Sequence, residues 1–322
     1  CWGSWGNTQK LAAKSWRYEL FYWDYVIGMV IFSLLLALTL GTFGPEGRPF
    51  FQDIAQADSS AIISIIIGGV IFNLSNICLS ASTSIAGMSV AFPVGCGLAL
   101  VLGVINNLRV EMSQGALKSN LTLLAIGVAL VVVAVVLNGI ASGKKAGNAE
   151  ISKADQRKGI ILAVVAGVVM SFFSSFVMKA MDLKDFANME PGKVGPYTAI
   201  VVFSLAVLAS HFIFGPIFMK WPFQGAPVKM SEYFKGNSKT HLVGMLGGCI
   251  WCLGTALSYI AAGKAGASVS YALGQGAPMV AAIWGVFVWK EFKGSNKTVY
   301  GLLGAMFCFF LVGLGMIVAA GM

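Results

Sequence analysis

Aromatic rings and amide side chains crowd the first residues of the chain in a pattern that could bind a polar, ring-shaped solute. On a helix, Trp2, Trp5 and Gln9 share one face, because they lie at positions i, i+3 and i+7. Aromatic faces cover a flat ring and an amide exchanges hydrogen bonds with it, and a sugar requires both. The alternative is an aromatic belt at a membrane interface, which fits Trp16 and Trp23 better than the deeper Trp5.

Further polar side chains interrupt later apolar runs. Asn73 and Asn76 lie three residues apart and face the same way on a helix. Trp251, Thr255 and Tyr259 follow one another at a spacing of four. Buried polar groups in lipid need partners, which are either neighbouring helices or a bound solute. Both interpretations stay open, and in the second the solute-binding residues are Trp5, Gln9, Asn73, Asn76, Trp251, Tyr271 and Gln275.

Two stretches mix glycine with proline inside apolar runs. They are "SVAFPVGCG" at 89–97 and "SYALGQGAP" at 270–278. Glycine and proline at corresponding places in two halves predict broken helices beside a binding site. The alternative is close packing of continuous helices, which small residues also permit.

Asp24 and Glu19 are the candidates for taking up a proton. Asp24 opens the second apolar run between Trp23 and Tyr25, and Glu19 lies five residues earlier. Exclusion of water by the rings favours the protonated carboxyl, so Asp24 is the first candidate and Glu19 the second. The alternative is that both are hydrated carboxylates at the membrane boundary.

No pattern typical of an enzyme or a metal site accompanies these residues. His211 and His241 have no Cys, His or carboxylate at metal-ligand spacing, and GxSxG and HExxH motifs are absent. Cys249 and Cys252 form a CxxC in the middle of an apolar run, where small residues pack helices. We therefore expect no catalytic residue, no metal and no cofactor.

Composition restricts the class of protein. Of the 322 residues 57% are apolar and 11% charged, against about 25% charged in soluble domains. The mean hydropathy is +0.80. The net charge of +9 lies in the gaps between apolar runs, as topology signals do, which argues against a nucleic-acid partner. An all-α polytopic membrane protein in contact with lipid is expected.

Ten membrane spans are predicted, and nine of them are near the roughly 20 residues that a spanning helix needs. The first is short: helical residues 1–12 would cover about 18 Å of a core of about 30 Å. The chain is thus expected to be a fragment that starts inside its first span; the alternative is a lipoprotein that starts on a lipidated Cys1. The other runs cover about 20–42, 60–80, 84–105, 117–141, 158–178, 196–219, 241–262, 266–290 and 298–320.

An internal repeat relates the two halves. Residues 68–101 match residues 247–280 at an offset of 179, with 11 identities in 34 positions. The matched blocks lie five spans apart, and because five is odd the second copy must enter the membrane from the other side. This predicts two inverted five-helix repeats, 1–141 and 158–322, joined by a loop at 142–157.

Lysine and arginine predict the orientation. Alternate gaps hold 15 of the 22 basic residues, in the gaps near 10–17, 144–158, 220–239 and 290–297. The positive-inside rule then places these gaps in the cell and both termini outside.

The opening "CWGSWGNTQKLA" and the following "YELFYWDY" carry a family resemblance. They resemble the drug/metabolite transporter superfamily, in particular its glucose/ribose porter, rhamnose–proton symporter and ureide permease branches. The resemblance implies a ten-helix bundle with a central cavity between the halves. It also implies import of a small polar solute, in many members with protons.

The expected function is a secondary transporter in the cell inner (plasma) membrane that imports a monosaccharide by proton symport. The alternatives are a metabolite or drug exporter, a ureide or nucleobase-type permease, and a membrane scaffold or sensor that transports nothing. Exporters of bulky cations place a carboxylate deep in the bundle. We expect every Asp and Glu here at or beyond the end of a span, which argues against export.

Overall fold

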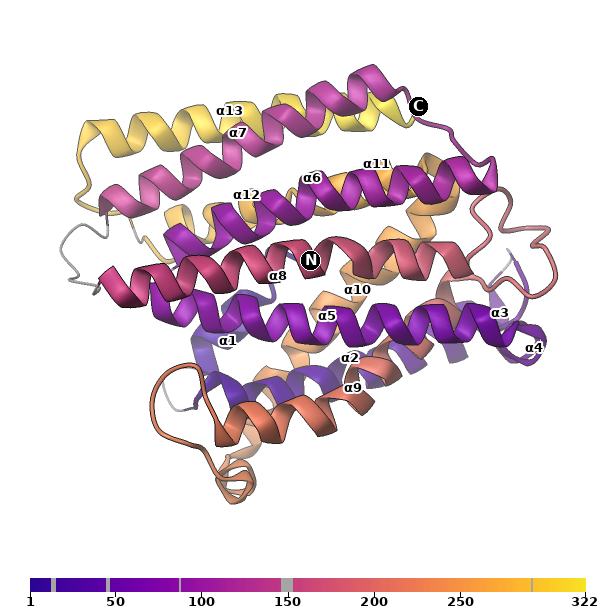
Figure 1. Cartoon of the computed structure of the whole chain (residues 1–322), viewed down its shortest axis with the longest axis horizontal. Coiled ribbons are helices and arrows are strands. Elements are labelled where there is room, and N and C mark those ends of the chain that lie inside the picture. Colours follow the sequence, from indigo (N-terminus) through magenta and orange to yellow (C-terminus); the bar gives the residue numbers. More distant parts are fainter. Residues whose placement is uncertain (13–15, 45–46, 87, 146–152, 291) are drawn as a thin grey trace.

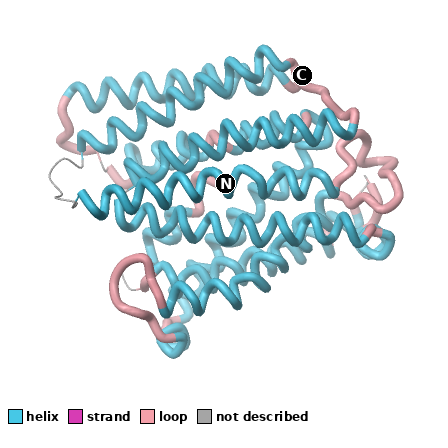
Figure 2. Tube along the Cα trace, viewed as in Figure 1, coloured by secondary structure: helices cyan, strands magenta, loops and turns pink. Residues whose placement is uncertain are grey.

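The computed structural model describes residues 1–12, 16–44, 47–86, 88–145, 153–290 and 292–322, and helices dominate this part (Figures 1 and 2). Within it, nine helices are long and apolar enough to cross a membrane, which confirms the predicted all-α polytopic membrane protein. The predicted first span contains the short helix α1, and part of the predicted loop 142–157 lies outside the described residues. The helices are α1 (Gly6–Ala12), α2 (Tyr18–Leu38), α3 (Leu40–Phe43), α4 (Phe50–Gln56), α5 (Ser59–Ala86), α6 (Met88–Gln114), α7 (Leu121–Lys145), α8 (Lys153–Ala180), α9 (Pro196–Lys220), η1 (a 3-10 helix, Met230–Lys235), α10 (Ser238–Ala265), α11 (Ala267–Gly274), α12 (Ala277–Ile283), η2 (a π-helix, Trp284–Val288) and α13 (Lys297–Ala320).

Local sequence explains where several of these helices begin and end. The side chains of Asn120, Asn237 and Asn296 accept hydrogen bonds from backbone N–H groups in the first turns of α7, α10 and α13. Pro196 occupies the first position of α9, where no backbone donor is lost. Gly266 ends α10 with a φ of 92°, a conformation that favours glycine.

The long helices lie side by side, and their connections gather at two ends of the bundle (Figure 1). One end, here called the basic end, holds residues 16–17, 220–237 and 292–297; the other, here called the distal end, holds residues 47–58, 115–120 and 181–195. The basic end collects the lysine-rich gaps and is the predicted inner side.

Helix boundaries repeat at the offset found in the sequence. The first and last residues of α5 and α10 each differ by 179 positions, and α6 and α11 begin at the same offset. Packing partners repeat too: α8 and α9 pack on α5, whereas α1 and α2 pack on α10. Three helices of the first half, α2, α6 and α7, also pack on the helix at the corresponding place of the second half, which is α9, α11 and α13 respectively. A two-fold relation between the halves would produce this pattern.

The predicted helix breaks differ between the halves. In the second half, Gln275 and Gly276 separate α11 from α12, as predicted. In the first half, stretch 89–97 lies within the continuous helix α6, so the predicted break is wrong there. Gly95 packs directly against Gly167 of α8, so here the glycine serves close packing, the alternative interpretation.

Candidate functional site

Aromatic side chains from both halves meet between α5, α9 and α10. Trp251 of α10 is buried, and the centroid of its ring lies 4.4 Å from the centroid of the Phe72 ring on α5. It also stacks on Phe203 of α9, at 5.9 Å between centroids, and on Trp2, at 6.0 Å. The predicted site residue Trp251 therefore joins the first residues of the chain to both halves of the bundle.

The two tryptophans that precede α1 are held by different helices. The indole N–H of Trp2 donates to the hydroxyl of Thr255 over 2.9 Å, and its ring lies against Gly254 and Gly274. Gly274 directly precedes the helix break, so Trp2 packs on the interrupted part of the second half. Trp5 instead contacts the ring of Tyr25 on α2, at 5.0 Å between centroids.

A chain of contacts connects Trp5 to Asn76. The centroid of the Tyr25 ring lies 5.3 Å from the centroid of the Tyr22 ring. The Tyr22 hydroxyl in turn accepts a hydrogen bond of 3.0 Å from Nδ2 of Asn76. Tyr25 is fully buried, and its hydroxyl has no hydrogen-bond partner among the described residues. Two predicted site residues thus lie at the ends of one polar and aromatic row that crosses α2.

Asn73 and His211 extend this row toward α9. Nδ2 of Asn73 donates to Ser210 Oγ over 2.9 Å, so this nitrogen joins two helices, as the packing interpretation expects. Its Oδ1, however, has no partner in the described part of the chain. The same holds for both ring nitrogens of His211, which is 2% exposed and lies against the rings of Tyr22 and Trp23.

The remaining predicted binding residues lie on α1 and α11. The hydroxyl of Tyr271 donates to the Ala99 carbonyl over 3.0 Å, and its ring fits against Gly103 of α6. Tyr271 thus fastens α11 to α6. Gln275 is half-buried at the helix break and Gln9 is half-buried on α1.

Asp24 lies in a hydrogen-bonded cluster at the basic end. The carboxylate is 1% exposed, and Nδ1 of His241 on α10 lies 3.0 Å from each of its oxygens. The Tyr233 hydroxyl on η1 donates to Asp24 Oδ1 over 2.6 Å. Burial, and then the hydrogen bond and charge of Asp24, raise the pKa of Tyr233 well above its usual value. The phenol therefore keeps its proton, and remains a donor, throughout the physiological range.

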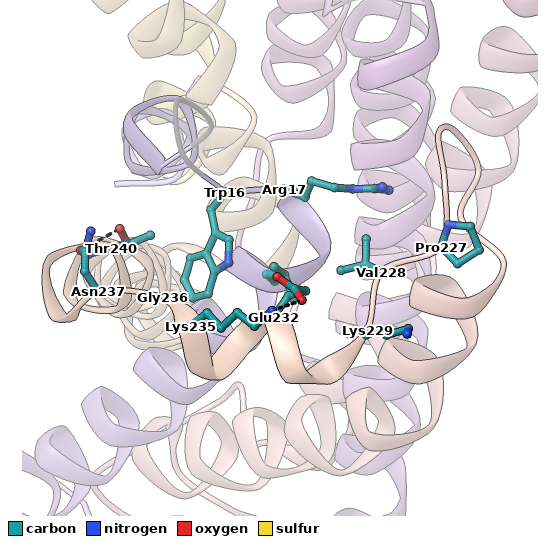
Figure 3. Close-up of a pocket in the computed structure, with 11 residues that line it drawn as sticks. Trp16, Arg17, Pro227, Val228, Lys229, Glu232, Lys235, Gly236, Asn237 and Thr240 are labelled. Atoms are coloured by element: carbon teal, nitrogen blue, oxygen red, sulfur yellow. Dashed lines mark hydrogen bonds and ion pairs between the residues drawn. The ribbon is translucent and has the colours of Figure 1, made fainter.

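An open cavity of about 730 Å³ adjoins this cluster at the basic end (Figure 3). Trp16 lines it and also stacks on Tyr233, with its ring edge-on to His241 at 4.7 Å. Trp16 therefore contacts both the opening and two members of the Asp24 cluster. The cavity is lined by Trp16, Arg17, Leu20, Pro227, Val228, Lys229, Glu232, Lys235, Gly236, Asn237 and Thr240.

Glu19, the second candidate for proton uptake, has a different environment. Both of its oxygens accept hydrogen bonds from the Arg17 guanidinium. Arg17 also donates to the carbonyls of Ala226 and Gln224. Glu19 therefore holds the arginine that anchors the loop between α9 and η1.

The third candidate span ends later than predicted, and one acidic residue lies in its last turn. Glu111 lies in α6, within the candidate span Val94–Gln114, and is fully buried. The predicted third span ended at 105, because the polar run from Asn106 onward interrupts the apolar pattern. The helix continues because these side chains find partners: Asn106 donates to the Ser171 carbonyl and Glu111 accepts from Ser268.

Sequence patterns missed His241, Tyr233 and His211. Neither histidine lies at metal-ligand spacing from another ligand, and His241 lies 217 positions from Asp24, too far for any sequence motif to relate them. A usable signal was the scarcity of ionisable side chains near apolar runs, since each of these is a functional candidate by default.

Nine candidate spans and a row of buried polar groups among them, within the described residues, are the features of a multi-pass membrane transporter. The chain belongs to the ureide permease family, whose model matches residues 21–158 and 149–320. It is a secondary transporter of small solutes.

Curated relatives agree with this class. Ureide permease 1 of Arabidopsis thaliana is 23% identical over 99% of this chain and 93% of its own length. Ureide permease 2 of the same plant is 22% identical over 99% of this chain and 94% of its own length. The L-rhamnose-proton symporter of Yersinia pestis is 26% identical over 52% of this chain and 48% of its own length.

Proposed function

We propose that this chain imports a small, uncharged polar solute together with protons, and that the solute binds between the two halves. The observation that carries the proposal is the row of buried polar atoms without protein partners in the described part of the chain: Tyr25 Oη, Asn73 Oδ1 and the ring nitrogens of His211. Such groups are costly in a bilayer unless a solute or water bonds to them. The rings of Trp5 and Tyr22 beside them offer flat apolar faces.

Two solute classes suit this lining. A monosaccharide has hydroxyls for the amides and C–H faces for the indoles, and the similarity to an L-rhamnose-proton symporter supports it. A cyclic ureide offers paired N–H and C=O groups to the same amides, and the matches to ureide permeases across 99% of the chain support it. The proposed binding residues are Trp5, Gln9, Asn73, Asn76, Trp251, Tyr271 and Gln275, to which we add Tyr25 and His211.

Proton coupling is assigned to Asp24 with His241, ahead of Glu19. The Asp24 cluster adjoins the open cavity and can exchange a proton with water there, whereas Glu19 is paired with a permanently charged arginine. The repeated helix boundaries support an inverted repeat of the drug/metabolite transporter type, in which the halves rock around the solute. With the basic end inside the cell, the cavity beside the Asp24 cluster opens toward the cytoplasm of a plasma membrane.

Solute uptake tests the proposal directly. Purified protein in liposomes is offered radiolabelled L-rhamnose, D-ribose, D-glucose and the cyclic ureide allantoin, with the outside either acidic or at the internal pH. Uptake of one class above protein-free liposomes, increased by the acidic exterior, is expected. The same solute should raise the unfolding temperature, because a ligand stabilises the state that binds it.

Three results would contradict the proposal. No uptake of any of the four solutes under either condition would argue against import, and uptake that ignores the pH gradient would remove Asp24 from its role. Efflux driven by the gradient, without influx, would indicate an exporter.

Tyr233→Phe should shift the pH midpoint of uptake upward by about one pH unit. The variant removes a hydrogen bond to a carboxylate, worth about 1.5–3 kcal/mol, and one pH unit corresponds to about 1.4 kcal/mol. Without that donor the ionised carboxylate is less stable, so the proton is retained to higher pH. Initial rates measured between pH 5 and pH 9 give the midpoint.

Tyr300→Phe is the matched control. Its hydroxyl also lies at the basic end but donates to the Phe292 carbonyl, so its midpoint should equal that of the wild type. Equal shifts in the two variants would show that the effect is not specific to the Asp24 cluster.

A further inference from the structure

The turn between α10 and α11 is held by two opposite charges from the end of α6 and the loop that follows it. Oε1 of Glu111 accepts from the backbone N–H of Ser268 over 3.1 Å, and Oε2 accepts from the Ser268 hydroxyl over 2.6 Å. Lys118 donates to the carbonyl of Gly263, near the end of α10. A carboxylate thus binds the start of α11 and an ammonium group binds the end of α10.

The signs of these charges match the helix ends that they bind. A helix N-terminus carries partial positive charge from its free N–H groups, and a C-terminus carries partial negative charge from its free carbonyls. Glu111 is 0% exposed, so water does not compete for its hydrogen bonds. A Cβ at Gly266 would overlap the Glu111 carboxylate, so the turn is shaped around this group.

The helix that Glu111 holds is a short, separate unit. The break at Gln275 and Gly276 disconnects α11 from α12, so α11 can tilt without moving the rest of the span. Tyr271 lies one turn beyond Ser268, and Gln275 lies at the far end. Two side chains connect α11 to α6 by hydrogen bonds: Tyr271, which donates to the Ala99 carbonyl, and Glu111, which accepts from Ser268.

We propose that Glu111 is a positioning residue for solute binding: it holds the half-helix α11 against α6, so that Tyr271 and Gln275 face the solute in the bound geometry. Lys118 supports it by fixing the other side of the turn. The inference rests on the proposed function, in which these two side chains line the site. Releasing α11 lowers affinity for the solute without removing any group that contacts it.

The test compares four single variants and one double variant of this chain in liposomes and nanodiscs. Glu111→Gln removes the charge, Ser268→Ala removes the hydroxyl donor, and Ser268→Thr keeps it. Ser270→Ala is the matched control, because that hydroxyl lies on α11, is equally buried, and donates to the Ser258 carbonyl instead. KM and Vmax are measured for whichever of L-rhamnose, D-ribose, D-glucose and allantoin the wild type takes up, and hydrogen exchange is followed in residues 267–274.

Glu111→Gln and Ser268→Ala should each raise KM about tenfold, with Vmax little changed. This is about the loss of affinity expected when one hydrogen bond to a charged group is removed. Their double variant should be no worse than either single one, because both remove the same connection. Amide exchange in residues 267–274 should increase in both, while Ser268→Thr and Ser270→Ala match the wild type.

Three outcomes would overturn the inference. They are an unchanged KM in Glu111→Gln and Ser268→Ala, an equal KM increase in Ser270→Ala, and unchanged exchange in residues 267–274. Should the wild type take up none of the four solutes, the proposed function fails, yet the exchange measurement still decides whether Glu111 holds α11.

Discussion

Solute uptake driven by a pH gradient is expected to fall at least about 30-fold in Asp24→Asn, the lower end of what losing one partner of a buried, hydrogen-bonded charge pair costs. An amide has nearly the size of a carboxylate, so the cluster can still form around it. It cannot take up and release a proton, however, so the coupling between proton and solute is lost. Accumulation in acidic medium and solute exchange at equal pH are the two measurements, and exchange should survive.

Glu19→Gln is the matched control for this prediction. Glu19 is an acid of similar burial on the same helix, five residues away, but Arg17 holds it in an ion pair. Its variant should still accumulate solute. If instead Asp24→Asn accumulates solute like the wild type and Glu19→Gln does not, Glu19 and not Asp24 is the residue that couples the proton to transport.

Gly248→Ala is expected to lower the unfolding temperature by about 5–10 °C, from an overpacking cost of about 3 kcal/mol. α2 and α10 approach so closely that a Cβ at Gly248 would overlap the carbonyl oxygen of Tyr25. From the other side, a Cβ at Gly28 would overlap the carbonyl oxygen of Met245. Backbone atoms cannot rotate away as a side chain can, so the two helices must separate.

Gly304→Ala is the control, since nothing lies within 4 Å of a Cβ at that position of α13. Its unfolding temperature, measured in detergent by loss of helical circular dichroism, should equal or exceed that of the wild type, because alanine favours a helix. An unchanged temperature for Gly248→Ala would contradict the close α2–α10 contact.

The same contact positions the Asp24 cluster. Gly244, one turn before Gly248, lies directly against Cβ of Asp24, so α10 comes close enough for His241 to reach the carboxylate. Separating the helices should therefore impair proton coupling as well as stability, and Gly248→Ala should also reduce uptake in acidic medium.

Much of the fold follows from the sequence by itself. The hydrocarbon core requires long apolar helices, and each segment meets this requirement through its own sequence alone. The predicted runs 196–219 and 298–320 therefore agree closely with the helices Pro196–Lys220 and Lys297–Ala320. The repeat at an offset of 179 also anticipated the paired boundaries of α5 and α10. The scarcity of charge near apolar runs is also what makes Asp24 a candidate for proton uptake.

Only the tertiary structure decided which side chains meet. Tyr233 and His241 lie 209 and 217 positions from Asp24, and Ser268 lies 157 positions from Glu111. The tertiary structure also decided the role of the glycines. At 274–276 they separate α11 from α12, whereas Gly95 lets α6 pack closely against α8. A run of apolar residues shows that a segment spans the membrane. Because such a helix is apolar on every face, the run does not show which face meets which neighbour. Which neighbour each polar group reaches depends on how closely the backbones approach, and that is set by small residues on two helices at once.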